Sequence, residues 1–225
     1  MVRTYKILHV DTIKNNTPYT REMNIDKLFD FCDKAFIDCY PWDNSGYKPL
    51  AFASILYDIK GMYIKLQAFE EIIIARYLKN DDPVYKDSCM EFFLNAFPAY
   101  SQKYLNFEFN PFGTMLLGFG SSRTDRVYIG KMNNNIFNIK SGISKNHKDR
   151  KDIFSWHITF FIPFEFLHTV YEINSCIINE MKGNFYKCGD DTSFPHYGCW
   201  NNIDKEYSDF HCPEFFGNLI LNRIQ

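Results

Sequence analysis

Residues 87–120 read DSCMEFFLNAFPAYSQKYLNFEFNPFGTMLLGFG and carry the strongest structural signal in the chain. Apolar and polar residues alternate here with the period of two that is typical of β-strands. The alternation covers two segments, 89–94 and 104–110. One face of both segments is apolar, and we expect it to pack into a core, because burial of apolar surface is the main favourable term in folding. The residues expected on this core face are Met90, Phe92, Leu94, Leu105, Phe107 and Phe109.

The opposite face of the same two segments is polar. The first segment contributes Glu91 to this face, and the second contributes Tyr104, Asn106 and Glu108. The tetrapeptide 110–113, Asn-Pro-Phe-Gly, suits a type I turn and returns the chain into a third strand over 114–119. The sequence therefore predicts a sheet with one packed face and one solvated face rich in carboxylates and amides.

Similar alternation recurs along the chain and predicts an all-β fold. Further strands are expected at 50–57, 62–69, 71–77, 127–129, 153–162, 176–186 and 216–221. The other expected elements are an extended lead-in over 1–21, a short helix after Asn24, a charged loop over 144–152 and a short helix within 164–171. About ten strands joined by hairpin turns, without long helices, predict an antiparallel β-sandwich. We expect one domain over residues 1–225, with Phe154, Trp156, Ile158 and Phe160 also in its core.

Composition narrows the class of function. The formal net charge of −2 gives no basic footprint for nucleic acid. No apolar run approaches the roughly 18 residues of a membrane span. The first residues also lack the apolar run of roughly 7–15 residues that an export signal needs, which leaves open both a cytoplasmic location and export by a signal upstream.

Cysteines are odd in number and scattered, at positions 32, 39, 89, 176, 188, 199 and 212. None forms a CxxC pair, which argues against a disulfide framework and against a Cys-rich zinc site. We expect reduced thiols that behave as small buried apolar groups.

The long irregular segment 189–213 is the best candidate for a functional loop, because long loops without regular structure are usually functional. Trp200 lies in its middle, among polar residues. Its ring can act as a flat apolar plate for a sugar ring, with amides, carboxylates and arginines binding the hydroxyl groups. The alternative is that Trp200 closes the end of the sandwich.

Two other chemistries remain open for the acidic residues. Glu91 and Glu108 on adjacent strands can lie ~5 Å apart, the carboxylate spacing of a retaining glycosidase. Calcium is a candidate cofactor, with Asp87, Asp190 and Asp191, together with Glu91, as its oxygen ligands, although no EF-hand spacing is present. A structural or accessory sandwich without a working site is the third alternative.

Five ordered motifs carry a resemblance to a known family. They are VYKDSCMEFFL (84–94), YLNFEFNPFGTML (104–116), GNFYKCGD (183–190), PHYGCW (195–200) and DFHCPEFFGNLIL (209–221). Together they resemble the bacterial carbohydrate-binding family 9-like proteins, relatives of the family 9 carbohydrate-binding modules attached to xylanases. The resemblance runs from about Trp42 to the C-terminus. It implies a DOMON-like β-sandwich that binds sugars without hydrolysing them.

The resemblance also implies a sugar site, in which two Trp clamp the sugar with help from a Glu and an Arg. Tyr85 stands at the position of the first Trp, and Trp200 is the counterpart of the second. Glu91 matches the family's Glu, whereas Glu108 occupies the Arg position, so Arg123 can replace that Arg only if the fold brings it near. The predicted carbohydrate site comprises Tyr85, Glu91, Asn106, Glu108, Arg123, Lys187, His196 and Trp200. The expected ligand is an oligo- or polysaccharide of plant or host origin, xylan-like in the first instance.

Overall fold

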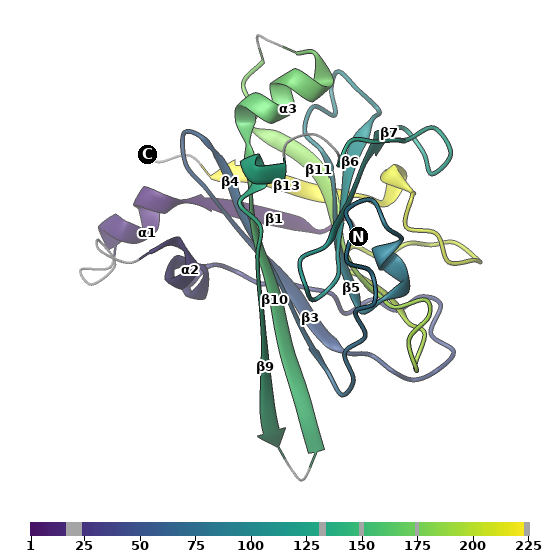
Figure 1. Cartoon of the computed structure of the whole chain (residues 1–225). Helices are drawn as coiled ribbons and strands as arrows, with labels where there is room; N and C mark the ends of the chain where they lie inside the picture. The colour runs from purple at the N-terminus through teal and green to yellow at the C-terminus, as the bar shows by residue number, and fades with distance from the viewer. Residues whose placement is uncertain (17–23, 131–133, 149–150, 174–175, 223–225) are drawn as a thin grey trace.

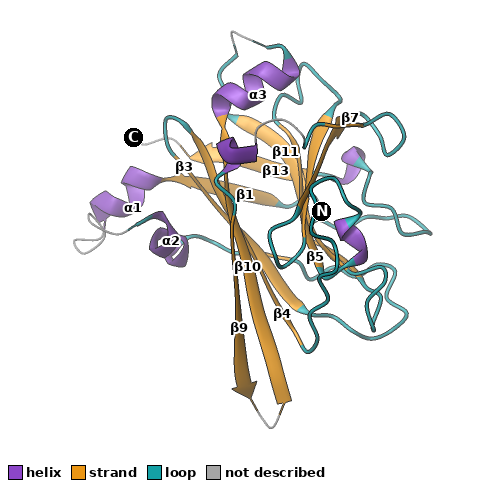
Figure 2. Ribbon diagram, viewed as in Figure 1, coloured by secondary structure: helices purple, strands orange, loops and turns teal. Residues whose placement is uncertain are grey.

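A computed structural model describes residues 1–16, 24–130, 134–148, 151–173 and 176–222. Within them, thirteen strands form one curled sheet, a half-barrel (Figures 1 and 2). The first half of the sheet is, in spatial order, β8 (Val127–Tyr128), β7 (Met115–Gly120), β6 (Tyr104–Phe109), β5 (Cys89–Asn95), β11 (Glu180–Cys188) and β13 (Gly217–Asn222). The second half is β1 (Thr4–His9), β3 (Leu50–Tyr57), β4 (Gly61–Glu70), β10 (Lys151–Pro163) and β9 (Lys140–Lys148). Two short strands lie beside this path, β12 (Tyr197–Cys199) against β11 and β2 (Ala35–Phe36) against β3.

Three short α-helices lie at the margins of the sheet, as Figure 2 shows. They are α1 (Val10–Asn16), α2 (Ile25–Leu28) and α3 (Phe164–Tyr171). The side chain of Asn24 accepts a hydrogen bond from the backbone N–H of Lys27, so the expected helix cap is confirmed. Single 3₁₀ turns are η1 (Phe29–Phe31), η2 (Val84–Lys86), η3 (Asn134–Phe137) and η4 (Pro213–Phe215). Among the described residues, no helix combines the length and apolar character needed to cross a membrane.

The all-β class is confirmed, but the sheet is not purely antiparallel. β1 pairs in parallel with β13 on one side and with β3 on the other. Residues 4–9 therefore form a central strand where an extended lead-in was expected. Tyr5 and Ile7 explain the placement, because both side chains are buried in the main core and their strand needs a partner on each edge. One curled sheet folded over its core thus takes the place of two separate sheets.

Two other local predictions are wrong. Residues 71–77 do not form a strand, because side chains take their backbone donors: Asp87 accepts from the N–H groups of Arg76 and Tyr77, and Ser88 accepts from that of Ile74. Within the charged loop expected over 144–152, residues 144–148 and 151–152 instead belong to the β9–β10 hairpin, which projects from the body (Figure 1), and residues 149–150 lie outside the described residues. Its charges pair across the strands, with Lys145 Nζ 2.6 Å from a carboxylate oxygen of Asp152.

The inner face of the curled sheet holds the main core. All ten expected core residues are buried there except Phe154, which is half-buried on the projecting hairpin. The outer face of β5 and β6 is also buried, contrary to the expected solvated face. Phe210, Ile203 and Phe216 from the distant segment 200–216 pack over it. The carboxylates and amides predicted to face water therefore lie beneath a loop.

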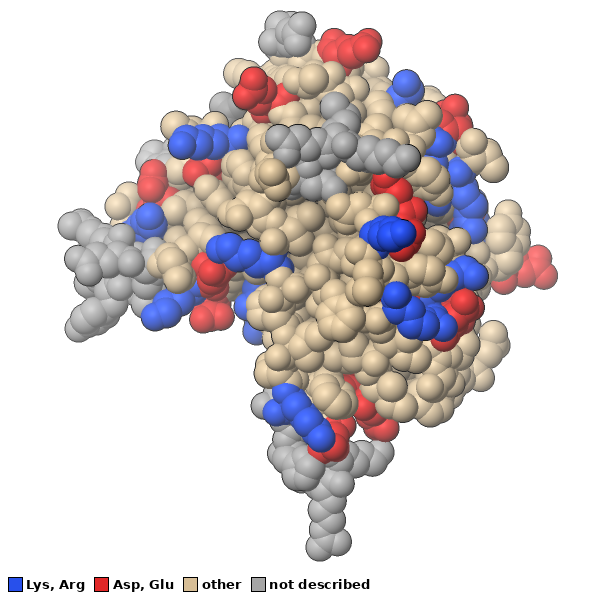
Figure 3. Space-filling view, in the orientation of Figure 1, with Lys and Arg blue, Asp and Glu red and all other residues tan. Residues whose placement is uncertain are grey.

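On the face shown in Figure 3, basic and acidic side chains of the described residues are interspersed around an uncharged middle. Neither sign of charge dominates this face.

Candidate functional site

A pocket of about 210 Å³ opens over the outer face of β5 and β6. Its walls come from both strands, from η2, from the segment before β8 and from the covering loop. The lining residues are Tyr85, Glu91, Glu108, Arg123, Arg126, Cys188, Asp190, Phe210 and His211. Four of the predicted site residues, Tyr85, Glu91, Glu108 and Arg123, are thus brought together.

Glu91 and Glu108 lie directly opposite each other on β5 and β6 and are almost fully buried, at 3% and 2% exposure. Burial raises the pKa of Glu91 well above its usual range, and the facing charge of Glu108 adds to the effect. Burial raises the pKa of Glu108 to about 7, against the opposing influence of Arg126. The two carboxyl groups therefore share a dry site in which holding both charges is unfavourable.

Glu108 is only half satisfied by the protein. Its Oε1 accepts from the Asn106 amide at 2.7 Å and from the Arg126 guanidinium at 3.4 Å. Its Oε2 is buried and has no hydrogen-bond partner among the described residues. A buried acceptor of this kind carries a desolvation cost of about 1–3 kcal/mol until a donor reaches it.

Arg126 is the guanidinium that the site needs beside Glu108. Its Nη1 donates to His211 Nε2 at 2.8 Å, which leaves the ring proton on Nδ1, where it donates to the Tyr104 hydroxyl at 2.8 Å. Burial and the two neighbouring arginines lower the pKa of His211 to about 3, so the ring is neutral. Arg126 is therefore held in place by a neutral histidine, with its guanidinium directed at Glu108 and the pocket.

Glycines make this arrangement possible. In the β7–β8 pairing, Gly118 lies opposite Tyr128, so Arg126 follows opposite Gly120. A Cβ at Gly118 would meet the side chains of both Asn106 and Arg126. Because Gly118 and Gly120 have no side chains, Arg126 crosses over β7 and reaches Glu108 on β6.

Aromatic rings and ion pairs lie in the pocket walls and beside them. Tyr85 is half-buried, and burial raises the pKa of its hydroxyl group. Tyr128 is 53% exposed and lies under the Arg126 guanidinium, 5.4 Å from it. Arg123 forms an ion pair with Asp209 at 2.9 Å, and burial raises the pKa of Asp190. The pocket thus combines flat apolar surface with charged hydrogen-bonding groups.

Lys187 and His196 were predicted in this site, but Lys187 lies on the inner face of β11 and His196, from the segment before β12, contacts it there. The Lys187 ammonium donates to Glu70 at 3.0 Å, to His196 Nε2 at 2.9 Å and to the Cys188 carbonyl at 2.9 Å, so its three N–H groups are all used. Glu70 also accepts from Trp156 Nε1 at 2.5 Å. These residues form a buried network, and their placement in the sugar site is wrong.

Trp200 does not face Tyr85 across a cleft. It is 4% exposed, its backbone N–H donates to the Phe185 carbonyl, and its ring packs edge-on to Phe185, 5.6 Å between centroids, in the main core. A buried ring cannot stack on a sugar, so the alternative packing role is the correct one. Asn106 is also fully buried, and it reaches the pocket only through Glu108.

The acidic calcium candidates are not gathered around one point. Asp87 accepts from the Arg76 guanidinium and the Asn110 amide as well as from backbone N–H groups, so its oxygens are engaged. Asp191 pairs with Lys86 at 3.4 Å. Calcium binding by Asp190 and Asp191 stays a prediction. Over the described ranges, the metal-ligating groups that lie close enough to share an ion are Cys89, Glu91 and Cys188.

Sequence reasoning missed Arg126 and His211 as site residues. The alternating glycines at 118 and 120 are the signal that could have pointed to Arg126, because they mark a place where another chain segment approaches closely.

The sequence model described as carbohydrate-binding family 9 matches residues 23–221. The chain belongs to carbohydrate-binding family 9. Three solved structures share the fold of this chain over 99% of its length. A candidate carbohydrate-binding protein from Bacteroides uniformis is 22% identical, with a TM-score of 0.76 and 100% of its own chain covered.

The other two structures are family 9 modules from Caldicellulosiruptor kristjanssonii, one in complex with glucose and one with cellotriose. Each is 11% identical, with TM-scores of 0.59 and 0.58 and with 97% and 95% of their own chains covered. No curated protein matches the chain.

Proposed function

We propose that this family 9 chain binds a saccharide, without hydrolysing it, in the pocket above Glu91 and Glu108. The observation that carries the proposal is the buried Oε2 of Glu108, which has no partner within the described part of the chain and belongs to a pocket-lining side chain. A sugar hydroxyl group supplies the missing donor. Family membership and the family 9 modules solved with glucose and cellotriose support the choice of ligand class.

The chemistry of the walls suits a sugar. Carboxylates accept from hydroxyl groups, Arg123 and Arg126 donate to hydroxyl and ring oxygens, and the half-buried ring of Tyr85 offers a plate for C–H groups. The volume of about 210 Å³ is below the roughly 300–1,000 Å³ typical of drug-sized ligands, so it accommodates about one sugar ring. The pocket therefore suits one ring at the end of an oligo- or polysaccharide. As ligands we propose chains of plant or host origin, with xylan-derived chains first and gluco-oligosaccharides second.

Glu108→Gln is expected to weaken saccharide binding by about ten- to hundredfold, because hydrogen bonds to a charged acceptor contribute about 1.5–3 kcal/mol. Titration calorimetry with xylo-, cello- and manno-oligosaccharides, in reductant and chelator, measures the change. The matched control is Glu165→Gln, an exposed carboxylate in the first turn of α3, which should leave affinity unchanged. Equal affinities of wild type and Glu108→Gln for a bound sugar would rule out this site.

Glycoside hydrolysis is the second candidate, and one observation favours it. Glu91 and Glu108 are opposed, buried and raised in pKa beside a pocket, as the acid and nucleophile of a glycosidase are. However, both carboxyl groups rise from the same face of adjacent strands and so approach a bound sugar from one side. A retaining enzyme needs its two carboxyl groups to flank the scissile bond.

We therefore expect no turnover of aryl glycosides or xylo-oligosaccharides by the wild-type chain. Product release is followed by chromatography over long incubations at pH values on both sides of 7. The Glu91→Gln and Glu108→Gln variants serve as blanks for contaminating activity. Turnover that disappears in both variants would establish hydrolysis instead.

A further inference from the structure

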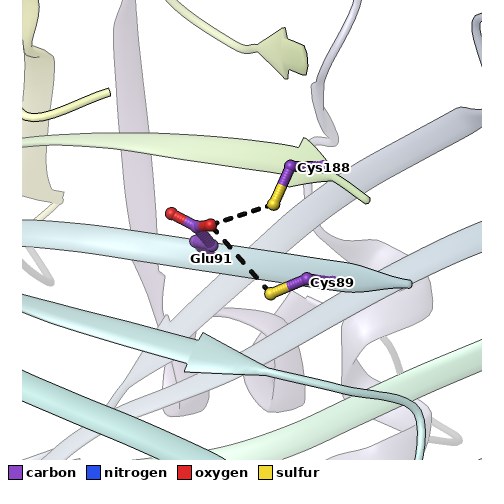
Figure 4. Close-up of side chains that lie close together, drawn as sticks. All are labelled: Cys89, Glu91 and Cys188. Carbon is purple, nitrogen blue, oxygen red and sulfur yellow. Dashed lines mark hydrogen bonds between the residues drawn. The ribbon is translucent and has the colours of Figure 1, made fainter. Parts of the chain in front are cut away.

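A cluster of sulfur and oxygen atoms lies beneath the saccharide pocket. Cys188 on β11 is directly opposite Cys89 on β5, and Glu91 follows two residues later on the same face of β5. Figure 4 shows the three side chains pointing toward one another. The Cys188 thiol donates to Glu91 Oε1 at 3.1 Å, the Cys89 sulfur lies 4.0 Å from the same oxygen, and all three ligand atoms are within 4.8 Å of one another.

This spacing is close to that of a tetrahedral metal centre. Zinc binds thiolate sulfur at about 2.3 Å and carboxylate oxygen at about 2.0–2.2 Å, which sets neighbouring ligand atoms about 3.5 Å apart. Small side-chain rotations bring the three atoms to that separation. We propose that Cys89, Glu91 and Cys188 bind a zinc ion whose fourth coordination position faces the saccharide pocket.

The donor set selects the class of metal. Two thiolates and one carboxylate suit zinc or a similar soft divalent ion, whereas calcium and magnesium require oxygen ligands. Glu91 and Cys188 both line the pocket, so a metal ion held between them and Cys89 has one side open to the pocket. Water or an oxygen of a pocket ligand completes the coordination there.

The surroundings also suit the charge of the complex. Three anionic ligands and one divalent cation leave one negative charge, and the positive charges of Arg126 and Lys187 act on Glu91 and Cys89 respectively. Zinc binds thiolate sulfur, so binding displaces the protons of the two thiols and releases them to solvent.

The zinc site does not depend on saccharide binding, and its test contains no sugar. The reduced, chelator-treated full chain is titrated with Co²⁺ and then with Zn²⁺. We expect sulfur-to-cobalt charge-transfer absorption and strong visible bands of a tetrahedral centre, saturating at one equivalent and abolished by zinc. Cys89→Ser and Cys188→Ser should lose the charge-transfer absorption, and Glu91→Gln should bind at least about tenfold more weakly.

Cys32→Ser is the matched control, because Cys32 is also a buried thiol but belongs to a separate cluster near α2. It should give the wild-type spectrum. Near-ultraviolet circular dichroism shows whether each variant is folded. X-ray absorption at the zinc edge of the wild-type chain tests the ligands without any substitution, and two sulfur neighbours are expected.

Three results overturn the proposal. They are zinc bound without sulfur neighbours, no zinc or cobalt bound by the reduced wild-type chain, and charge-transfer absorption that survives in folded Cys89→Ser and Cys188→Ser.

Discussion

Replacing Lys187 by methionine is expected to lower the free energy of unfolding by about 3–5 kcal/mol, because it leaves a buried carboxylate without its counter-charge. Lys187 is fully buried, and its ammonium satisfies Glu70 and His196 at once. Methionine matches the length of the apolar stem but donates nothing. Urea denaturation followed by fluorescence and circular dichroism measures the loss.

Two further variants identify the cause. Lys182→Met on the same strand removes a half-buried lysine and should change stability by less than about 0.5 kcal/mol. Combining Lys187→Met with Glu70→Gln removes both charges and should recover part of the loss. A Lys187→Met protein as stable as wild type would show that the network contributes little to folding.

Phe107→Ala is expected to cost about 3–5 kcal/mol, through lost apolar burial and the cavity that remains. The Phe107 ring is fully buried and packs against Phe109, Phe137 and Phe160, with centroid distances of 6.5, 5.5 and 5.4 Å. These neighbours come from β6, η3 and β10, so the ring ties both halves of the sheet together. The shift in denaturation midpoint at constant slope gives the value.

Phe112→Ala provides the comparison, because Phe112 lies in the turn after β6 and is 54% exposed. Its removal should have little effect. A small loss for Phe107→Ala would mean that the core closes around the missing ring, against the dense packing seen here.

The period of two predicted most of the strands, because alternation is a local property of the sequence. It could not predict that both faces of β5 and β6 are buried. Glu91, Asn106 and Glu108 looked solvated, since the cover over them comes from around Phe210 and His211, about a hundred residues later and without regular periodicity. What lies over a sheet is set by tertiary packing, which alternation does not encode.

Part of the site was predictable, and one error was avoidable. Tyr85, Glu91, Glu108 and Arg123 do line one pocket, although their role in binding stays a prediction. Lys187 was assigned to the same site as Glu91, yet alternation along β11 places it with Phe185, on the inner face. For Trp200, local sequence carries no such signal, because the backbone hydrogen bond to Phe185 that turns its ring inward joins two separate segments.

The position of β13 bears on how the protein is made. This strand lies between β11 and β1, and it pairs Thr4 with Asn218, 214 positions apart. The ribosome therefore synthesises the joining strand after every other strand of the sheet, and until then β11 and β1 each present an unpaired edge. Contacts of such high sequence separation slow folding, and open edges invite association between chains. Completion of the half-barrel is thus a late step in folding, and the interval before it is when the chain is most exposed to aggregation.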